Sequence, residues 1–272
     1  MIRDENQGIV LYSYELFRPF PQVVNIVTTR IGGVSRDPLS SLNLSFSKMV
    51  DDEEQAVIIN RSRLYNLINI KPEHVAQAEL VHGSNVEIVS HTTPCGTFEK
   101  LSRTDGLITA LPNTALLIPV ADCAAISFFD PQAHIVAMIH AGWRGATRGI
   151  ISETVEKMST LGSHPSDILV GISPILKSCC YQVRQDMVDA VTRAFPTQAQ
   201  AFFVLQADDI HYQFDFLAML RWCLEESGIL PHHMEDSGIC TSCSTSEFYS
   251  YRAEQGPNGR TGRFAGLIVM RE

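Results

Sequence analysis

Short apolar runs rich in β-branched residues recur along this chain, and turn-forming residues separate them. Runs of this kind predict buried β-strands. We expect strands at residues 23–29, 80–81, 86–89, 105–109, 115–120, 125–129, 135–139, 168–172 and 264–270. The pair Asp130–Pro131 separates two of these runs, and its turn-forming character predicts a β-hairpin over 125–139.

A second pattern, in which apolar residues recur at spacings of three and four, predicts amphipathic helices. In the clearest case Ile151, Val155 and Met158 follow this spacing, and Gly162 is suited to end the helix. Further helices are expected from residue 51 or 52 to about 67, over 186–195 and over 216–227. Because strands and helices are mixed and several strands are neighbours in hairpins, we expect an α+β layered sandwich.

Composition narrows the class of protein. The chain has 272 residues, of which 45% are hydrophobic and 19% charged, and this length suits one large domain, which we expect over residues 1–272. The net charge of −9 argues against nucleic acid or an anionic membrane as a partner. Apolar runs stay short of the ~20 residues that cross a bilayer. The stretch MIRDENQGIV lacks the apolar segment of a secretory signal, so we expect a cytoplasmic protein. The sequence leaves the oligomeric state open.

Three residues that bind metals in other proteins stand where predicted strands meet turns: His82, Cys123 and His140. Side chains at strand ends converge at one sheet edge even when they are far apart in sequence. Two imidazoles and a thiolate suit zinc, and three protein ligands leave a fourth position open, as in catalytic zinc sites. The residues alone leave two other interpretations. One is a buried cysteine with two hydrogen-bonded histidines. The other is a Cys123 nucleophile with His140 as its base and Asp122 or another carboxylate to orient the base.

The remaining cysteines fall partly into two pairs. Cys240 and Cys243 have the C-x-x-C spacing of a zinc half-site or a redox pair, although two ordinary thiols would also fit. Cys179 and Cys180 are adjacent, and we predict that they serve packing rather than metal binding. The odd total of seven cysteines favours reduced thiols over a disulfide framework.

A series of motifs runs in one order from about residue 23 to the C-terminus. They read TTRIGGVS, LNLS, VHG, DGLIT, ADC, HAGWRG, CCYQV, FYSYR and TGR followed by GLI. Together they resemble the laccase-domain family, also called YfiH-like or multicopper polyphenol oxidoreductase, and ADC with HAGWRG is the most specific part. The resemblance implies a layered α/β/β/α sandwich of mixed sheets with outer helices.

The resemblance also implies a function. Members of the family bind zinc through the residues that match His82, Cys123 and His140 here. They resemble purine nucleoside phosphorylases that act on adenosine, inosine, guanosine and methylthioadenosine, with adenosine deaminase activity as well. The expected partners are therefore a nucleoside and phosphate, with zinc as cofactor.

Further site residues are expected around these ligands. Asp122 is predicted to move a proton or to support the metal ligands. Arg30 and Arg144 stand beside glycines, where a guanidinium group suits a phosphate, and both are predicted to bind it. Asn43 and Arg252 are predicted to line the substrate site.

The family name implies copper and phenol oxidation, which the histidines argue against. The chain has nine histidines and no His-x-His pair, whereas multicopper oxidases build several copper centres from many histidines. Three alternatives stay open: a cysteine hydrolase or amidase using Cys123 and His140, a copper-dependent polyphenol oxidase, and a non-catalytic metal-binding protein. The sequence departs from the family pattern at Leu80, Ser173, Gln182 and Ala253, which affects substrate choice more than metal binding.

Overall fold

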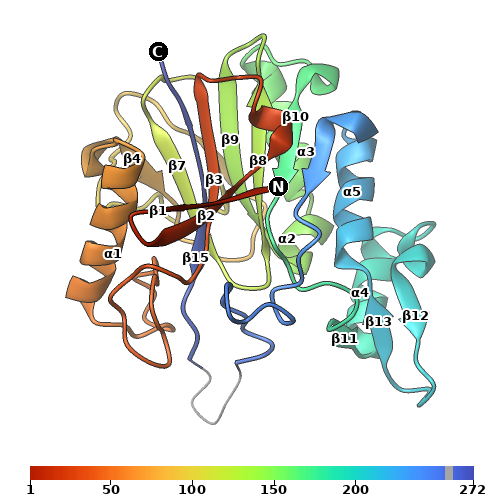
Figure 1. The fold of residues 1–272 in the computed structure, drawn as a ribbon. Coiled ribbons are helices and arrows are strands. Elements are labelled where there is room, and N and C mark those ends of the chain that lie inside the picture. Colours follow the sequence, from red (N-terminus) through yellow and green to blue (C-terminus); the bar gives the residue numbers. More distant parts are fainter. Residues whose placement is uncertain (255–259) are drawn as a thin grey trace.

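The computed structural model describes residues 1–254 and 260–272. In this part of the chain the strands form two six-stranded mixed sheets and one three-stranded sheet (Figure 1). The first sheet runs in the order β1 (Ile2–Asn6), β2 (Ile9–Ser13), β3 (Val23–Thr28), β15 (Phe264–Met270), β7 (Ala115–Val120) and β4 (Val75–Gln77). The second sheet runs β14 (Met234–Asp236), β10 (Leu169–Ile172), β8 (Ala124–Asp130), β9 (Ile135–Ala141), β6 (Gly106–Thr109) and β5 (Val86–Ile88).

The remaining elements surround these two sheets. The small sheet contains β11 (Gln182–Val183), β13 (Tyr212–Phe214) and β12 (Phe203–Leu205). The α-helices are α1 (Glu54–Leu67), α2 (Trp143–Thr147), α3 (Ile150–Thr160), α4 (Gln185–Ala194) and α5 (Phe216–Glu226). Short 3-10 helices lie at Glu15–Phe17, Pro72–His74, Pro165–Asp167, Ala199–Phe202 and Pro231–His233. Among the described residues, no helix is long and apolar enough to cross a membrane.

Three apolar clusters hold the layers together. Residues such as Ile118, Met138 and Ile268 fill the space between the two large sheets. The other face of the second sheet is covered by α3 and α5, and the outer face of the first sheet by α1 (Figure 1). The strands therefore alternate in the side they present, so that both faces of each sheet are buried. The fold is the α/β/β/α sandwich that the family resemblance implies.

Most predicted elements occur within a residue or two of their expected ends. The hairpin of β8 and β9 is confirmed, with Ile126 opposite Ile139. The strand predicted at 80–81 is wrong. His82 has a left-handed backbone (φ 57°), and the N–H groups of Val81 and Gly83 bond to a side chain instead of a neighbouring strand. The hairpin of β1 and β2 and the small sheet were not predicted.

The loops at one end of the sandwich come together below the sheets in Figure 1. Strands β7 and β9 run toward this end, and β8 and β6 start from it, because each pairs antiparallel with a neighbour. The long loop after β3 and the loop after β14 reach the same end (Figure 1). Residues at the ends of these strands are thereby gathered at one sheet edge.

Candidate metal centre

The three predicted metal ligands converge at this edge. The donor atoms of His82, Cys123 and His140 all lie within 4.8 Å of one another. The two imidazole rings meet edge to face, with centroids 4.7 Å apart and planes at 81°. His140 is almost fully buried, Cys123 is half-buried and His82 is exposed, so the cluster opens to solvent on one side.

The register of the second sheet explains this convergence. Cys123 directly precedes β8, and His140 is the penultimate residue of β9, opposite Ala125. The same register brings Gly142 next to Cys123. A Cβ atom on Gly142 would lie 3.1 Å from the Cys123 Sγ and 3.2 Å from the His82 Cδ2, so a larger residue at this position would crowd both side chains.

Asp105, which the sequence analysis did not single out as a site residue, holds the two histidines. It directly precedes β6 and is fully buried. Its Oδ1 lies 2.8 Å from the His140 Nδ1 and accepts the backbone N–H of His82 at 2.9 Å. Because Nδ1 of His140 is engaged by Asp105, Nε2 is the nitrogen left for a metal. The sequence signal was present in the DGLIT motif, which places a carboxylate at the start of a strand.

The pKa values of these side chains depend on one another. Burial opposes ionisation of the Cys123 thiol, but His140 and His82 outweigh it and lower the pKa of Cys123 to about 6. Burial lowers the pKa of His140, yet Cys123 and Asp105 outweigh this effect and raise it to about 9. Burial raises the pKa of Asp105, but the hydrogen bonds from His140 and from the backbone N–H groups of Gly83 and Val81 outweigh it and lower the pKa. A thiolate, which is the form that binds zinc, is thus favoured at neutral pH.

Asp122 lies in the turn between β7 and β8, where its φ of 77° is left-handed. Both of its carboxylate oxygens are engaged. Oδ1 accepts the hydroxyls of Thr241 at 2.6 Å and Ser250 at 2.7 Å, and Oδ2 accepts the backbone N–H of Arg252 at 2.6 Å. Asp122 therefore joins the C-terminal loop to the turn that carries Cys123, and its predicted role in proton transfer stays a prediction.

Arginines approach the cluster from several segments. Arg144 is exposed in α2, and its guanidinium lies 4.4 Å from the centre of the Trp143 ring. Arg252 donates to the carbonyl of Gln182 at 3.0 Å. Burial raises the pKa of Tyr181, the negative charges of Cys123 and Asp122 raise it further, and Arg252 and Arg144 oppose them. Arg144, Arg252 and Tyr181 therefore all lie near Cys123 and Asp122.

Arg263 is a further cation that the sequence analysis did not single out. It follows the Thr-Gly of the TGR motif and donates to the carbonyls of Thr261 and Gly262, each at 2.8 Å. Burial lowers its pKa, while the negative charges of Cys123 and Asp122 act in the opposite direction. Arg263 thus lies close enough to Cys123 and Asp122 for their charges to affect its pKa.

Two predicted substrate residues have other contacts in this structure. Arg30 pairs with Glu254 at 2.6 Å and donates to the carbonyl of Ser40 at 2.8 Å, so binding phosphate would require it to leave that carboxylate. Asn43 is 0% exposed, and its side chain bonds to Asp52 and to the backbone of Arg263. The contacts of both residues brace loops, and substrate binding by either stays a prediction.

A hollow of about 690 Å³ lies elsewhere, between α3 and α5. Ile151, Phe195 and Trp222 contribute to its wall, and the three predicted metal ligands do not. Its lining includes the carboxylates of Glu156 and Glu226 and several hydroxyls, but no histidine or arginine. The strand-end cluster is therefore the candidate site because of its metal-binding side chains, and not because of the volume of a cavity.

The fold and this cluster define an α/β/β/α sandwich with a His–Cys–His candidate metal site at a sheet edge. Residues 24–271 match the family described as multi-copper polyphenol oxidoreductase laccase, and the chain belongs to that family. It is 34% identical over 256 residues to the purine nucleoside phosphorylase YlmD of Bacillus subtilis, covering 92% of this chain and 90% of that protein. It is 38% identical over 251 residues to a purine nucleoside phosphorylase of Mycobacterium tuberculosis, covering 92% of each.

Solved structures agree with this assignment. The crystal structure of YlmD from Geobacillus stearothermophilus superposes with a TM-score of 0.89 at 31% identity, covering 99% of this chain and 98% of that one. A Bacillus licheniformis YfiH protein gives a TM-score of 0.88 at the same identity, over 98% of this chain and 97% of that chain. The predicted family and fold are confirmed.

Proposed function

We propose that this chain is a zinc-dependent purine nucleoside phosphorylase that also deaminates adenosine. The observation that carries the proposal is the convergence of three donor atoms, two from imidazoles and one from a thiol, at a sheet edge open to solvent. The names of the relatives, purine nucleoside phosphorylases at 34% and 38% identity, support the substrate class. Adenosine, inosine, guanosine and methylthioadenosine are the proposed substrates.

The donor set fits zinc. A His₂Cys set with an open fourth position is typical of catalytic zinc sites, and a hydrogen bond donated by His140 Nδ1 to Asp105 is the usual support of a zinc-bound imidazole. A zinc ion held here would act as a Lewis acid and lower the pKa of a coordinated water to about 7. The same three ligands would also accept copper, which is the competing proposal for the metal.

Phosphorolysis breaks the bond between the purine nitrogen and the anomeric carbon of the ribose, while a phosphate oxygen forms a bond to that carbon. The products are the free purine and ribose 1-phosphate. Arg144 and Arg252 are proposed to bind the phosphate, since guanidinium groups match phosphate oxygens with paired donors. Arg263 is proposed as a third cation in this set. Asp122 is proposed to hold the turn at Cys123 in place and to take part in proton transfer.

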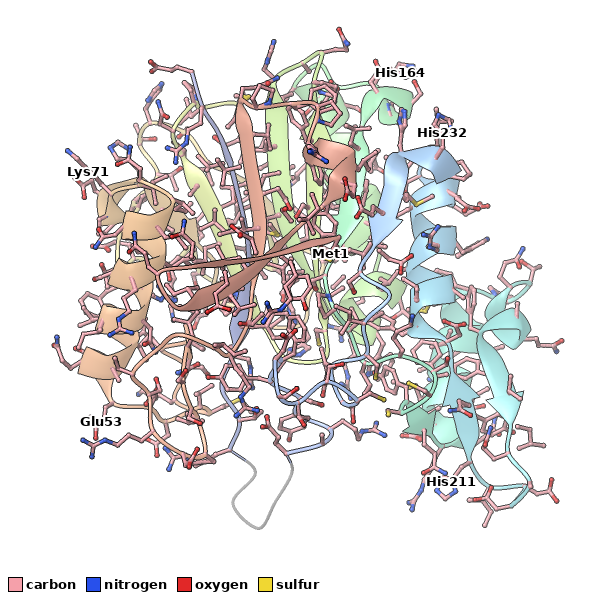
Figure 2. All side chains as sticks on the ribbon, viewed as in Figure 1. Met1, Glu53, Lys71, His164, His211 and His232 are labelled. Atoms are coloured by element: carbon pink, nitrogen blue, oxygen red, sulfur yellow. The ribbon has the colours of Figure 1, made fainter. Side chains whose placement is uncertain are left out.

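The test is phosphate-dependent release of hypoxanthine from inosine by the purified protein. We expect release that increases with phosphate concentration and that His82→Ala abolishes. His164→Ala is the matched control, because His164 lies on the surface at the opposite end of the molecule from the loops (Figure 2). Absence of release at every phosphate concentration would overturn the phosphorylase proposal. Conversion of adenosine to inosine, measured separately, tests the deaminase activity.

A cysteine hydrolase or amidase is the second candidate function. The specific observation in its favour is the lowered pKa of Cys123 beside His140, a pairing that also activates nucleophilic thiols. The two functions respond differently to a chelator. Metal removal abolishes activity in the zinc enzyme and leaves a cysteine hydrolase active, whereas alkylation of Cys123 inactivates both.

A further inference from the structure

Four cysteines form a second cluster, separate from the candidate metal centre. The sulfur atoms of Cys179, Cys180, Cys240 and Cys243 all lie within 4.8 Å of one another. The sequence analysis predicts packing for the first pair and leaves the second pair open. The structure corrects the first prediction, because Cys179 is exposed, Cys180 is half-buried and both approach the sulfur of Cys243.

Two backbone segments present these thiols. Ile175 and Cys240 form a parallel bridge, and the N–H of Thr241 donates to the carbonyl of Ile175 at 2.9 Å. The segment after Ile175 then turns at Lys177, whose carbonyl accepts the N–H of Cys180 at 2.9 Å. The C-x-x-C segment turns beside it. The bridge therefore fixes one cysteine of the cluster, and two short turns bring the others to it.

The spacing of the sulfurs suits a single ion. With Zn–S bonds of about 2.3 Å, four sulfurs at the corners of a tetrahedron lie about 3.8 Å apart. The Sγ atom of Cys243 lies 3.7 Å from that of Cys179 and 3.4 Å from that of Cys180. These distances are far longer than a disulfide bond of about 2.05 Å. A four-iron cluster would need the thiols spread around a larger core than this spacing leaves.

We propose that these four cysteines bind one zinc ion, in a structural site that no part of the proposed function uses. Four thiolates and one Zn²⁺ carry two net negative charges, and two cations lie next to the cluster. Lys177 donates to the carbonyl of Gly238 at 3.1 Å, and Arg252 donates to the carbonyl of Cys180 at 3.4 Å. A closed set of four thiolates is typical of structural zinc.

The position of the cluster indicates which segments the ion would hold together. Thr241, which lies between the two cysteines of the C-x-x-C segment, donates its hydroxyl to Asp122 at 2.6 Å. Cys180 lies just before β11, the first strand of the small sheet, which projects from the body below α5 in Figure 1. One ion would thus fasten the projecting sheet and the C-terminal loop to each other beside Asp122. Figure 2 shows sulfur atoms, in yellow, in this region between the body and the small sheet.

Metal content of the full chain, purified under reducing conditions without chelator, tests the proposal. We expect two zinc ions per chain in the wild type and one in Cys243→Ser or Cys179→Ser. We also expect one in His82→Ala, which empties the other centre. Cys95→Ser is the matched control and should retain both ions, because Cys95 belongs to neither cluster.

Cobalt substitution provides a readout that does not depend on the cysteine variants folding. Cobalt bound by four thiolates gives an intense charge-transfer band, which should appear in the wild type and persist in His82→Ala. The proposal is overturned by a single zinc that His82→Ala removes, by iron in place of zinc, or by a disulfide among these cysteines in the unreduced protein. Loss of this site leaves the inosine assay as an independent test of the proposed phosphorylase.

Discussion

Asp105 is the residue on which the geometry of the candidate centre depends. Its carboxylate accepts three backbone N–H groups, from Val81, His82 and Gly83, and also bonds to the ring of His140. One buried side chain therefore places one ligand through its backbone and another through its ring.

Asp105→Asn should weaken metal binding by about 10- to 100-fold, because the amide cannot accept from every donor that the carboxylate now satisfies. The measurement is competition for zinc against a chelator of known affinity, beside circular dichroism to follow the fold. Asp130→Asn is the matched control, since Asp130 is also buried and accepts backbone N–H groups, from Gln132 and Ala133. Equal affinity in wild type and Asp105→Asn would contradict the role given to Asp105.

Arg144→Gln should raise the KM for phosphate by about 10- to 100-fold, since a hydrogen bond to a charged group contributes about 1.5–3 kcal/mol. Among residues 1–254 and 260–272, no carboxylate lies within salt-bridge distance of Arg144, so a phosphate would not compete with an internal partner. Initial rates at varied phosphate and fixed inosine check the expectation. Arg193→Gln, on the exposed face of α4, should leave the KM unchanged. An unchanged KM in Arg144→Gln would remove Arg144 from the phosphate site.

At the scale of elements, the sequence was most informative where strands are long and apolar. Strands β7, β9 and β15 and the hairpin turn at Asp130 follow from the run of buried side chains and the turn residues. The same reasoning placed Cys123 and His140 at neighbouring strand ends, which is where they lie. The strands of the small sheet have only two or three residues, which is too short to show a period, and they were missed for that reason.

The loop that carries His82 shows a different limit. Leu80 and Val81 have the side chains of a strand, but the backbone N–H groups here bond to Asp105, more than twenty residues further along the chain. Local side-chain pattern does not contain that partner. The grouping of four cysteines was missed in a similar way, since Cys180 and Cys243 are brought together by the bridge between Ile175 and Cys240 and by the turns that follow it.

Helix α5 is tied to strand β14 by an ion pair whose effect should depend on pH. Arg221 Nη2 lies 2.6 Å from Asp236 Oδ2. Burial raises the pKa of Asp236, but the bonds from Arg221 and the backbone of Gly238 outweigh it and lower the pKa. A carboxyl group with a lowered folded-state pKa stabilises the protein above its unfolded pKa of about 3.9, and this contribution disappears as pH falls through the folded value.

Arg221→Gln should therefore reduce the free energy of unfolding at neutral pH by up to about 1 kcal/mol, as for a partly exposed pair. The difference from wild type should shrink as the pH falls below about 4. Urea unfolding at several pH values measures both effects. In the Asp236→Asn background the same arginine substitution should have little effect, and an equal loss in both backgrounds would show that the two side chains are not coupled.

At the scale of the whole molecule, the two layers of sheet place the candidate metal site at one end. Shorter connections between strands lie at the opposite end. Figure 2 shows Lys71 and His232 at that opposite end, and His211 far to the side, on the projecting hairpin of β12 and β13. The layered fold was predictable because strand-like apolar runs are mixed with amphipathic helices and several of the strands are neighbours in hairpins. The gathering of the long loops at one end was not, since it depends on the directions in which the strands run.

The hydrogen bonds of Asp105 also determine how the turn that carries His82 opens. The amides of Val81, His82 and Gly83 share one acceptor, so none of them stays protected from solvent once that carboxylate moves away. Their hydrogen exchange should consequently report a single opening free energy. A metal ion on His82 and His140 would slow the exchange of all three amides together. A comparison of the exchange of these backbone amides in the metal-free and metal-loaded protein would thus measure how fully the His82–Cys123–His140 site is occupied.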